Sequence, residues 1–152
     1  MCIIKFIKDN YPDKIIKHCK ESGCELSLVG IRNHIMLKGE KLSNEMVCDC
    51  IIFKKNNTLV IGLVELKSKT LHVRDIYKKL VNGAKIATSI LSKYKKAIEE
   101  IKLIPVVLHK SIDPMETREL GQKKYTIKHG GQNLYIRSRK CGTRFSELIR
   151  SI

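Results

Sequence analysis

Two apolar runs on either side of a short polar turn constrain the fold more than any other feature of this sequence. The runs are MVCDCIIF, residues 46–53, and TLVIGLVELK, residues 58–67, and both are rich in the β-branched residues that favour strands. The KKNN stretch between them is typical of a turn. We therefore predict that the two runs form a β-hairpin.

The predicted hairpin carries charges where a buried strand would carry none. A three-residue loop, 56–58, pairs Lys55 with Leu59 and places Asp49 opposite Glu65, with about 5 Å between their Cβ atoms. A two-residue loop would put the two carboxylates on opposite faces. Lys67 follows on the same face as Glu65, about 7 Å further along the strand. Burying neighbouring carboxylates requires compensation, which a divalent cation with oxygen ligands supplies.

The hairpin is followed by the clearest helical pattern in the chain. From Val73 to Ile101, apolar residues recur at three- and four-residue steps, which predicts one long helix. Gly83 lies inside this pattern and indicates either a close approach by another segment or simple tolerance. The run LIPVVLH, 103–109, predicts a buried strand with Pro105 at its start or at a sheet edge. Strand, helix and strand together predict a parallel crossover.

The ends of the chain carry shorter signals. Before the hairpin we predict a short helix between Asn10 and Gly23 and then one or two strands over 24–39. After the crossover we predict a helix over 113–121, capped by Asp113, a β-hairpin about Gly130 and Gly131, and a final short helix. No repeat or linker interrupts the 152 residues, so we expect a single domain over residues 1–152.

Net charge restricts the partners. Thirty Lys and Arg residues against fifteen Asp and Glu residues give a formal charge of +15 and a pI of about 9.7, which favours a polyanionic partner. The alternative is a lysine-coated surface that serves solubility alone. The lysines are scattered and form no basic amphipathic helix, which argues against membrane binding. Aromatic residues are 5% of the chain, so a stacking platform for single strands is poorly supported.

The N-terminus, and apolar runs all shorter than the roughly 18 residues of a membrane span, predict a cytoplasmic protein. The opening MCIIKFIKDN is too short and too interrupted by lysine to be a signal peptide. The six cysteines are therefore expected to be reduced thiols. A zinc site is disfavoured, because Cys48 and Cys50 alternate along the predicted strand and Cys19 and Cys24 flank the predicted helix end.

The spacing of the charged residues resembles that of a known superfamily. Asp49, a gap of fifteen residues, and then Glu65-Leu66-Lys67 across a hairpin, followed by a helix and a strand, resembles the PD-(D/E)XK metal-dependent nucleases over residues 47–108. The chain is similar in size to archaeal Holliday-junction resolvases. Cys48 stands where the superfamily name has proline, and Asn82 where many relatives carry glutamine. The resemblance implies an α/β fold with a restriction endonuclease-like core: a mixed central sheet in αβββαβ order and helices on both faces, here followed by the C-terminal β-hairpin.

The resemblance also implies a chemistry, the hydrolysis of a DNA phosphodiester by water. Asp49, Glu65 and the backbone carbonyl of Leu66 would hold Mg²⁺ or Mn²⁺, and Lys67 would orient the water and stabilise developing charge. A further acidic residue remains open among Glu21, Glu40 and Glu45. Residues expected to contact nucleic acid are Lys69, Arg74, Lys78, Asn82, Lys128, Arg137 and Arg139, with Lys140 beside them.

Other readings of the same residues stay open. Asp49 and Lys67 could form a structural salt bridge, and Glu65 could lie on a solvated edge strand. The chain could be a non-catalytic nucleic-acid-binding protein on a degenerate nuclease fold, or a nuclease directed at RNA. Cleavage of both strands of a duplex would favour a homodimer, although no residue indicates an interface.

Overall fold

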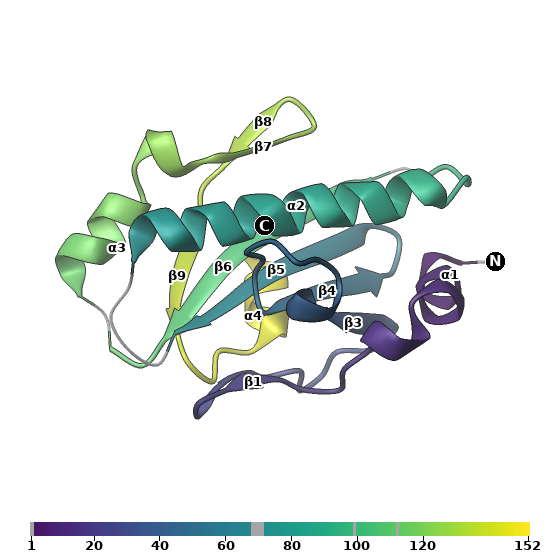
Figure 1. Ribbon diagram of the computed structural model, residues 1–152, viewed down its shortest axis with the longest axis horizontal. Helices are drawn as coiled ribbons and strands as arrows, with labels where there is room; N and C mark the ends of the chain where they lie inside the picture. The colour runs from purple at the N-terminus through teal and green to yellow at the C-terminus, as the bar shows by residue number, and fades with distance from the viewer. Residues whose placement is uncertain (1, 68–71, 99, 112) are drawn as a thin grey trace.

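A five-stranded mixed sheet forms the centre of the protein (Figure 1). The computed structural model describes residues 2–67, 72–98, 100–111 and 113–152. The strands lie in the order β3-β4-β5-β6-β9: β3 (His34–Lys38), β4 (Cys50–Lys55), β5 (Leu59–Lys67), β6 (Ile101–His109) and β9 (Arg137–Lys140). The first three are antiparallel, whereas β6 runs parallel to β5 and β9 parallel to β6. The predicted mixed α/β class is confirmed.

The hairpin register agrees with the three-residue loop. Lys55 pairs with Leu59, and the pairing continues to Cys50 with Val64. Because β4 begins at Cys50, Asp49 lies one position before the strand. This register places Asp49 next to Glu65 at the end of the sheet, as predicted.

Helices cover both faces of the sheet. The long helix α2 (Val73–Lys93) lies across one face, together with α1 (Ile3–Asn10), and their apolar residues pack on Ile51, Ile61 and other residues of that face. The other face is covered by α4 (Phe145–Arg150) and by a hairpin of β1 (Cys19–Glu21) and β2 (Cys24–Leu26). Burial of apolar surface in these two layers is the main stabilising term.

Two predicted helices differ in extent or type. Residues 10–23 do not form the predicted helix: α1 ends at Asn10, a short 3-10 helix follows at Pro12–Lys14, and the chain turns at Ser22 and Gly23, both with positive φ, to join β1 to β2. Such a two-residue turn suits the twist of a hairpin. Helix α2 ends at Lys93, and Ile101, expected at the helix end, begins β6 instead.

Pro105 lies inside β6 without breaking the sheet. Its neighbour on the β5 side is Leu63, whereas β9 begins to pair with β6 only at Val106. On the β9 side the strand is therefore still an edge at Pro105, where proline is tolerated. This agrees with the predicted edge position.

The C-terminal elements follow the predicted order. Helix α3 (Pro114–Leu120) begins with the expected cap, since the N–H of Met115 donates to Asp113 Oδ1 at 2.9 Å. A small hairpin of β7 (Ile127–His129) and β8 (Gln132–Leu134) turns at Gly130 and Gly131, and the chain then leaves it to form β9 in the central sheet. Short 3-10 helices lie at Pro12–Lys14, Gly39–Lys41 and Lys123–Tyr125.

Four cysteines are paired, which corrects the prediction of reduced thiols. Disulfides join Cys19 to Cys50 and Cys24 to Cys141. The β1–β2 hairpin is the physical reason, because it turns Cys19 and Cys24 toward the sheet face on which the partners lie. Cys48 precedes β4 and packs on the sheet face covered by α2, whereas Cys50 packs on the other face. The two cysteines therefore do not share a strand, contrary to the prediction from the sequence.

Across the parts of the chain that the structure describes, no helix is both long enough and apolar enough to cross a membrane.

Candidate metal centre

Asp49 and Glu65 meet at the end of the sheet where β4 begins. The backbone N–H of Leu66 donates a hydrogen bond to Asp49 Oδ2 at 2.7 Å, which ties the start of β4 to β5. Glu65 is 1% exposed and points to the face covered by α2. The two carboxylates predicted to converge do so. Glu65 is therefore a buried residue and not a solvated edge-strand residue.

Two lysines neutralise Glu65. Lys67 Nζ lies 3.4 Å from Glu65 Oε2, and Lys79 Nζ, from α2, lies 3.0 Å from the same oxygen. The other oxygen, Glu65 Oε1, is buried and has no hydrogen-bond partner in the described part of the chain. An ionised buried oxygen without a partner is costly, so this position favours a bound cation or donor.

The sequence reasoning missed Lys79. Its signal was present in the helix pattern, because Lys79 follows the buried Ile76 by three residues and precedes the buried Gly83 by four. That spacing puts it on the face of α2 that packs against the sheet. A lysine at such a position indicates a buried acidic partner across the interface.

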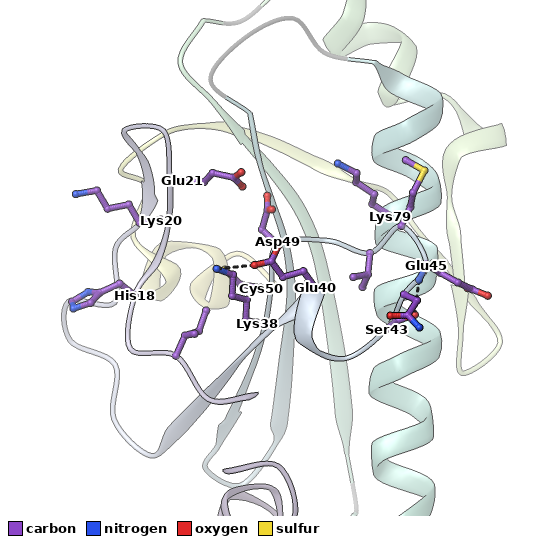
Figure 2. Close-up of a pocket in the computed structure, with 14 residues that line it drawn as sticks. His18, Lys20, Glu21, Lys38, Glu40, Ser43, Glu45, Asp49, Cys50 and Lys79 are labelled. Atoms are coloured by element: carbon purple, nitrogen blue, oxygen red, sulfur yellow. Dashed lines mark hydrogen bonds and ion pairs between the residues drawn. The ribbon is translucent and has the colours of Figure 1, made fainter. Parts of the chain in front are cut away.

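Glu21 is the third carboxylate of the site. It extends from β1 toward Asp49 (Figure 2), and its hydrogen bond with Asp49 raises the pKa of Glu21 above its usual value. Burial, reinforced by the charge of Glu65, raises the pKa of Asp49. Of the three acidic residues left open by the sequence, the structure thus brings Glu21 to Asp49. Glu40 pairs instead with Lys38 at 2.9 Å, and Glu45 is exposed on the far side of the cleft.

These residues open onto a cleft of about 650 Å³. Its lining includes Glu21, Asp49 and Lys79, with Lys20 and Lys38 on the wall formed by β1 and β3. Glu65 and Lys67 are not among its lining residues. The cleft therefore presents carboxylates and lysines together, an arrangement suited to a metal ion and an anionic ligand.

Among the residues that the structure describes, no group of three or more His, Cys, Asp or Glu side chains is already arranged as a metal site. The chemistry of the donors still fits a hard divalent cation. Glu21, Asp49 and Glu65 all offer oxygen ligands, and Glu65 Oε1 has no hydrogen-bond partner in the described ranges of the chain. Burial raises the pKa of Asp49 and the hydrogen bond with Asp49 raises that of Glu21, and a bound Mg²⁺ or Mn²⁺ would instead favour the ionised carboxylates.

The residues predicted to contact nucleic acid do not all lie together. Arg74 and Lys78 are exposed on the first turns of α2, near the site, whereas Lys128 is exposed on β7. Lys69 lies outside the described residues. Asn82 has a structural contact, since its Nδ2 donates to the carbonyl of Met46 at 2.5 Å and holds the segment before Asp49.

The arginines of β9 have local partners. Arg137 Nη1 donates to the carbonyl of Leu148 at 3.0 Å and also contacts the Ser151 hydroxyl, so its guanidinium binds the end of α4. Arg139 is exposed, and its Nη1 donates to the carbonyl of Ser138 at 2.9 Å. Lys140 is exposed at the end of the same strand.

Comparisons of the chain with protein-family models, with curated proteins and with solved structures find no significant match.

Proposed function

We propose that this protein hydrolyses DNA phosphodiesters in a reaction that depends on Mg²⁺ or Mn²⁺, as an endonuclease on a restriction endonuclease-like core. The supporting observation is the position of Glu65: it is 1% exposed, has one oxygen without a hydrogen-bond partner among the residues that the structure describes, and lies beside Asp49 and two lysines. A purely structural salt bridge would be expected to leave no orphaned buried oxygen.

Each residue has a role in this proposal. Asp49, Glu65 and the Leu66 carbonyl hold the cation, and Glu21 supplies the further carboxylate. When bound, the divalent ion supplies Lewis acidity at the phosphate and lowers the pKa of a water molecule. Lys67 orients that water and stabilises the charge that develops on the phosphate oxygens. Lys79 holds the Glu65 carboxylate in place through its ion pair with Oε2 at 3.0 Å.

The substrate assignment rests on charge. The +15 formal charge favours a polyanion, and the exposed Arg74 and Lys78 lie on the helix that also carries Lys79. Exposed cationic side chains on the helix that contributes Lys79 suit contacts with phosphates next to a scissile bond. Duplex DNA, with cleavage of both strands by a homodimer, is the form of the proposal we test first.

A nicking assay tests the proposal. Supercoiled plasmid, branched DNA, single-stranded DNA and RNA are incubated with the protein and Mg²⁺ or Mn²⁺, and compared with the variants Asp49→Ala and Lys67→Ala. We expect both variants to lose nicking while still binding DNA in a mobility-shift assay. The matched control is Glu45→Ala, which removes an exposed carboxylate from the same cleft and should keep wild-type activity.

The outcomes separate the alternatives. Cleavage of RNA but not of DNA would contradict the DNA substrate and favour an RNA-directed nuclease. DNA binding without cleavage of any substrate by the wild-type protein would contradict the enzyme and favour a non-catalytic binding protein. A crystal soaked in Mn²⁺ gives an independent check, with anomalous density expected between Asp49 and Glu65.

A further inference from the structure

The Cys19–Cys50 disulfide lies immediately beside two of the carboxylates. Cys19 precedes Glu21 by two residues on β1, and Cys50 directly follows Asp49 at the start of β4. The bond therefore joins the two segments that carry the carboxylate pair, with the two Cα atoms 6.0 Å apart. Both cysteines are buried, at 0% and 2% exposure.

Strand geometry connects the disulfide to the direction of Glu21. Side chains two residues apart in a strand point to the same face, so Cys19 and Glu21 point together toward the sheet. A bond that holds Cys19 against β4 consequently directs Glu21 at Asp49, the orientation seen in Figure 2.

Among the described residues, the backbone ties β1 to the central sheet only through the residues before it, where the N–H of Ile16 donates to the carbonyl of Met36 in β3 at 2.9 Å. Within the described residues β1 pairs only with β2, in a separate two-stranded sheet. The backbone hydrogen bonds that join this hairpin to the C-terminal segment involve β2 and the residues after it, not β1. For example, the N–H of Gly142 donates to the carbonyl of Glu25 at 2.7 Å. When both are ionised, the carboxylates of Glu21 and Asp49 repel each other, so loss of the covalent tie would let β1 move Glu21 away from Asp49.

We propose that Cys19 and Cys50 are positioning residues, whose disulfide holds Glu21 against Asp49 and so completes the acidic site for a divalent cation. The inference rests on the proposed metal-dependent function and adds a redox requirement to it. Reduction by a dithiol supplies two electrons and two protons: the sulfur–sulfur bond breaks, Cys19 and Cys50 become thiols, and the dithiol ends as a cyclic disulfide. Because both cysteines are buried, this exchange proceeds through an opened hairpin.

Mn²⁺ affinity tests the inference without reference to catalysis. Free Mn²⁺ is measured by its electron paramagnetic resonance signal in titrations of the wild-type protein and of the variant Cys19→Ala/Cys50→Ala. We expect the variant to bind Mn²⁺ about tenfold more weakly, the usual cost of losing a group that orients a metal ligand. The matched control is Cys24→Ala/Cys141→Ala, which breaks the other disulfide of the same hairpin and leaves β1 tied to β4; its affinity should stay within about twofold of wild type.

A double-mutant cycle with Glu21→Gln distinguishes a disulfide that positions Glu21 from a disulfide that stabilises the whole site. If the disulfide acts through Glu21, its removal in the Glu21→Gln background should change Mn²⁺ affinity by less than about twofold. A tenfold loss in both backgrounds would overturn the inference, because the disulfide would then act on the whole site. Should Cys19→Ala/Cys50→Ala fail to fold by circular dichroism, Cys19→Val/Cys50→Ala restores the lost apolar volume and enters the same cycle.

The failures of the two proposals are distinguishable. Equal Mn²⁺ affinity with and without the Cys19–Cys50 bond would overturn the positioning role and leave the proposed function standing. Absence of Mn²⁺ binding by the oxidised wild-type protein would overturn both. Peptide mapping that finds Cys19 and Cys50 unpaired in the active, air-oxidised protein would also overturn the positioning role.

Discussion

Lys79 Nζ lies 3.0 Å from Glu65 Oε2, the oxygen that Lys67 also approaches, at 3.4 Å. Helix α2 thus brings a second cation to a carboxylate that is 1% exposed. A buried carboxylate with a single, partly solvated partner would be poorly compensated, and the second lysine lowers that cost.

Replacing Lys79 should therefore destabilise the protein. We expect Lys79→Met to lower the free energy of unfolding by about 1–3 kcal/mol, the range for a hydrogen bond to a charged group. Urea denaturation monitored by circular dichroism measures this change in the free energy of unfolding. Lys78→Met, at the neighbouring exposed position of α2, is the control and should change stability by less than about 0.5 kcal/mol. Equal losses in the two variants would contradict the role of Lys79.

The carboxylate pair predicts how stability depends on pH. Burial raises the pKa of Asp49 above its usual 3.8, and the hydrogen bond with Asp49 raises that of Glu21 above its usual 4.5. A raised pKa means that the folded protein holds a proton the unfolded chain has released. This stabilisation is fully present below the unfolded pKa values and is lost as pH rises through the folded ones.

The metal-free wild type should consequently lose stability relative to Asp49→Asn/Glu21→Gln as pH is raised from about 4 to about 7. Urea denaturation curves across that range, in the presence of a chelator, measure the difference. Glu45→Gln is the control and should follow the wild type. A constant difference between wild type and the double variant at all pH values would show that the pair is not perturbed.

Gly83 lets α2 approach the segment before β4. A Cβ atom at this position would lie 2.5 Å from Cys48 Sγ, so alanine overfills the contact. We expect Gly83→Ala to lower the free energy of unfolding by about 1–3 kcal/mol, despite its better helix propensity. In a Cys48→Ala background the same change should be neutral or stabilising, because the clashing sulfur is gone. Additive effects of the two changes, measured by denaturant unfolding, would rule out this contact as the cause.

The Cys24–Cys141 disulfide joins positions 117 residues apart, across most of the chain. Removing it with Cys24→Ala/Cys141→Ala should lower the free energy of unfolding by about 2–5 kcal/mol, since the unfolded chain gains the freedom of a long loop. Thermal and denaturant unfolding of this variant measure the loss. An unchanged midpoint in both would mean that the bond contributes no net stability.

The local sequence determined the β4–β5 hairpin and, through it, the residues that this hairpin contributes to the site. The three-residue loop set the parity of β4 and β5, so the sequence alone sufficed to place Asp49, Glu65 and Lys67 on one side. The regular apolar spacing after Val73 likewise indicated α2, and Asp113 before Pro114 indicated the start of α3. In each case neighbours in the sequence are neighbours in space, and one periodicity decides the conformation.

Tertiary packing decided what local spacing could not. Residues 10–23 fit a helix by pattern, but burial of Cys19 and Cys24 against the sheet favours the β1–β2 hairpin. That hairpin brings Glu21 to Asp49 and forms both disulfides, and the docking of α2 brings Lys79 to Glu65. These contacts join residues 14 to 117 positions apart. Their energy comes from burial and charge pairing across the completed core, which no short stretch of the sequence contains.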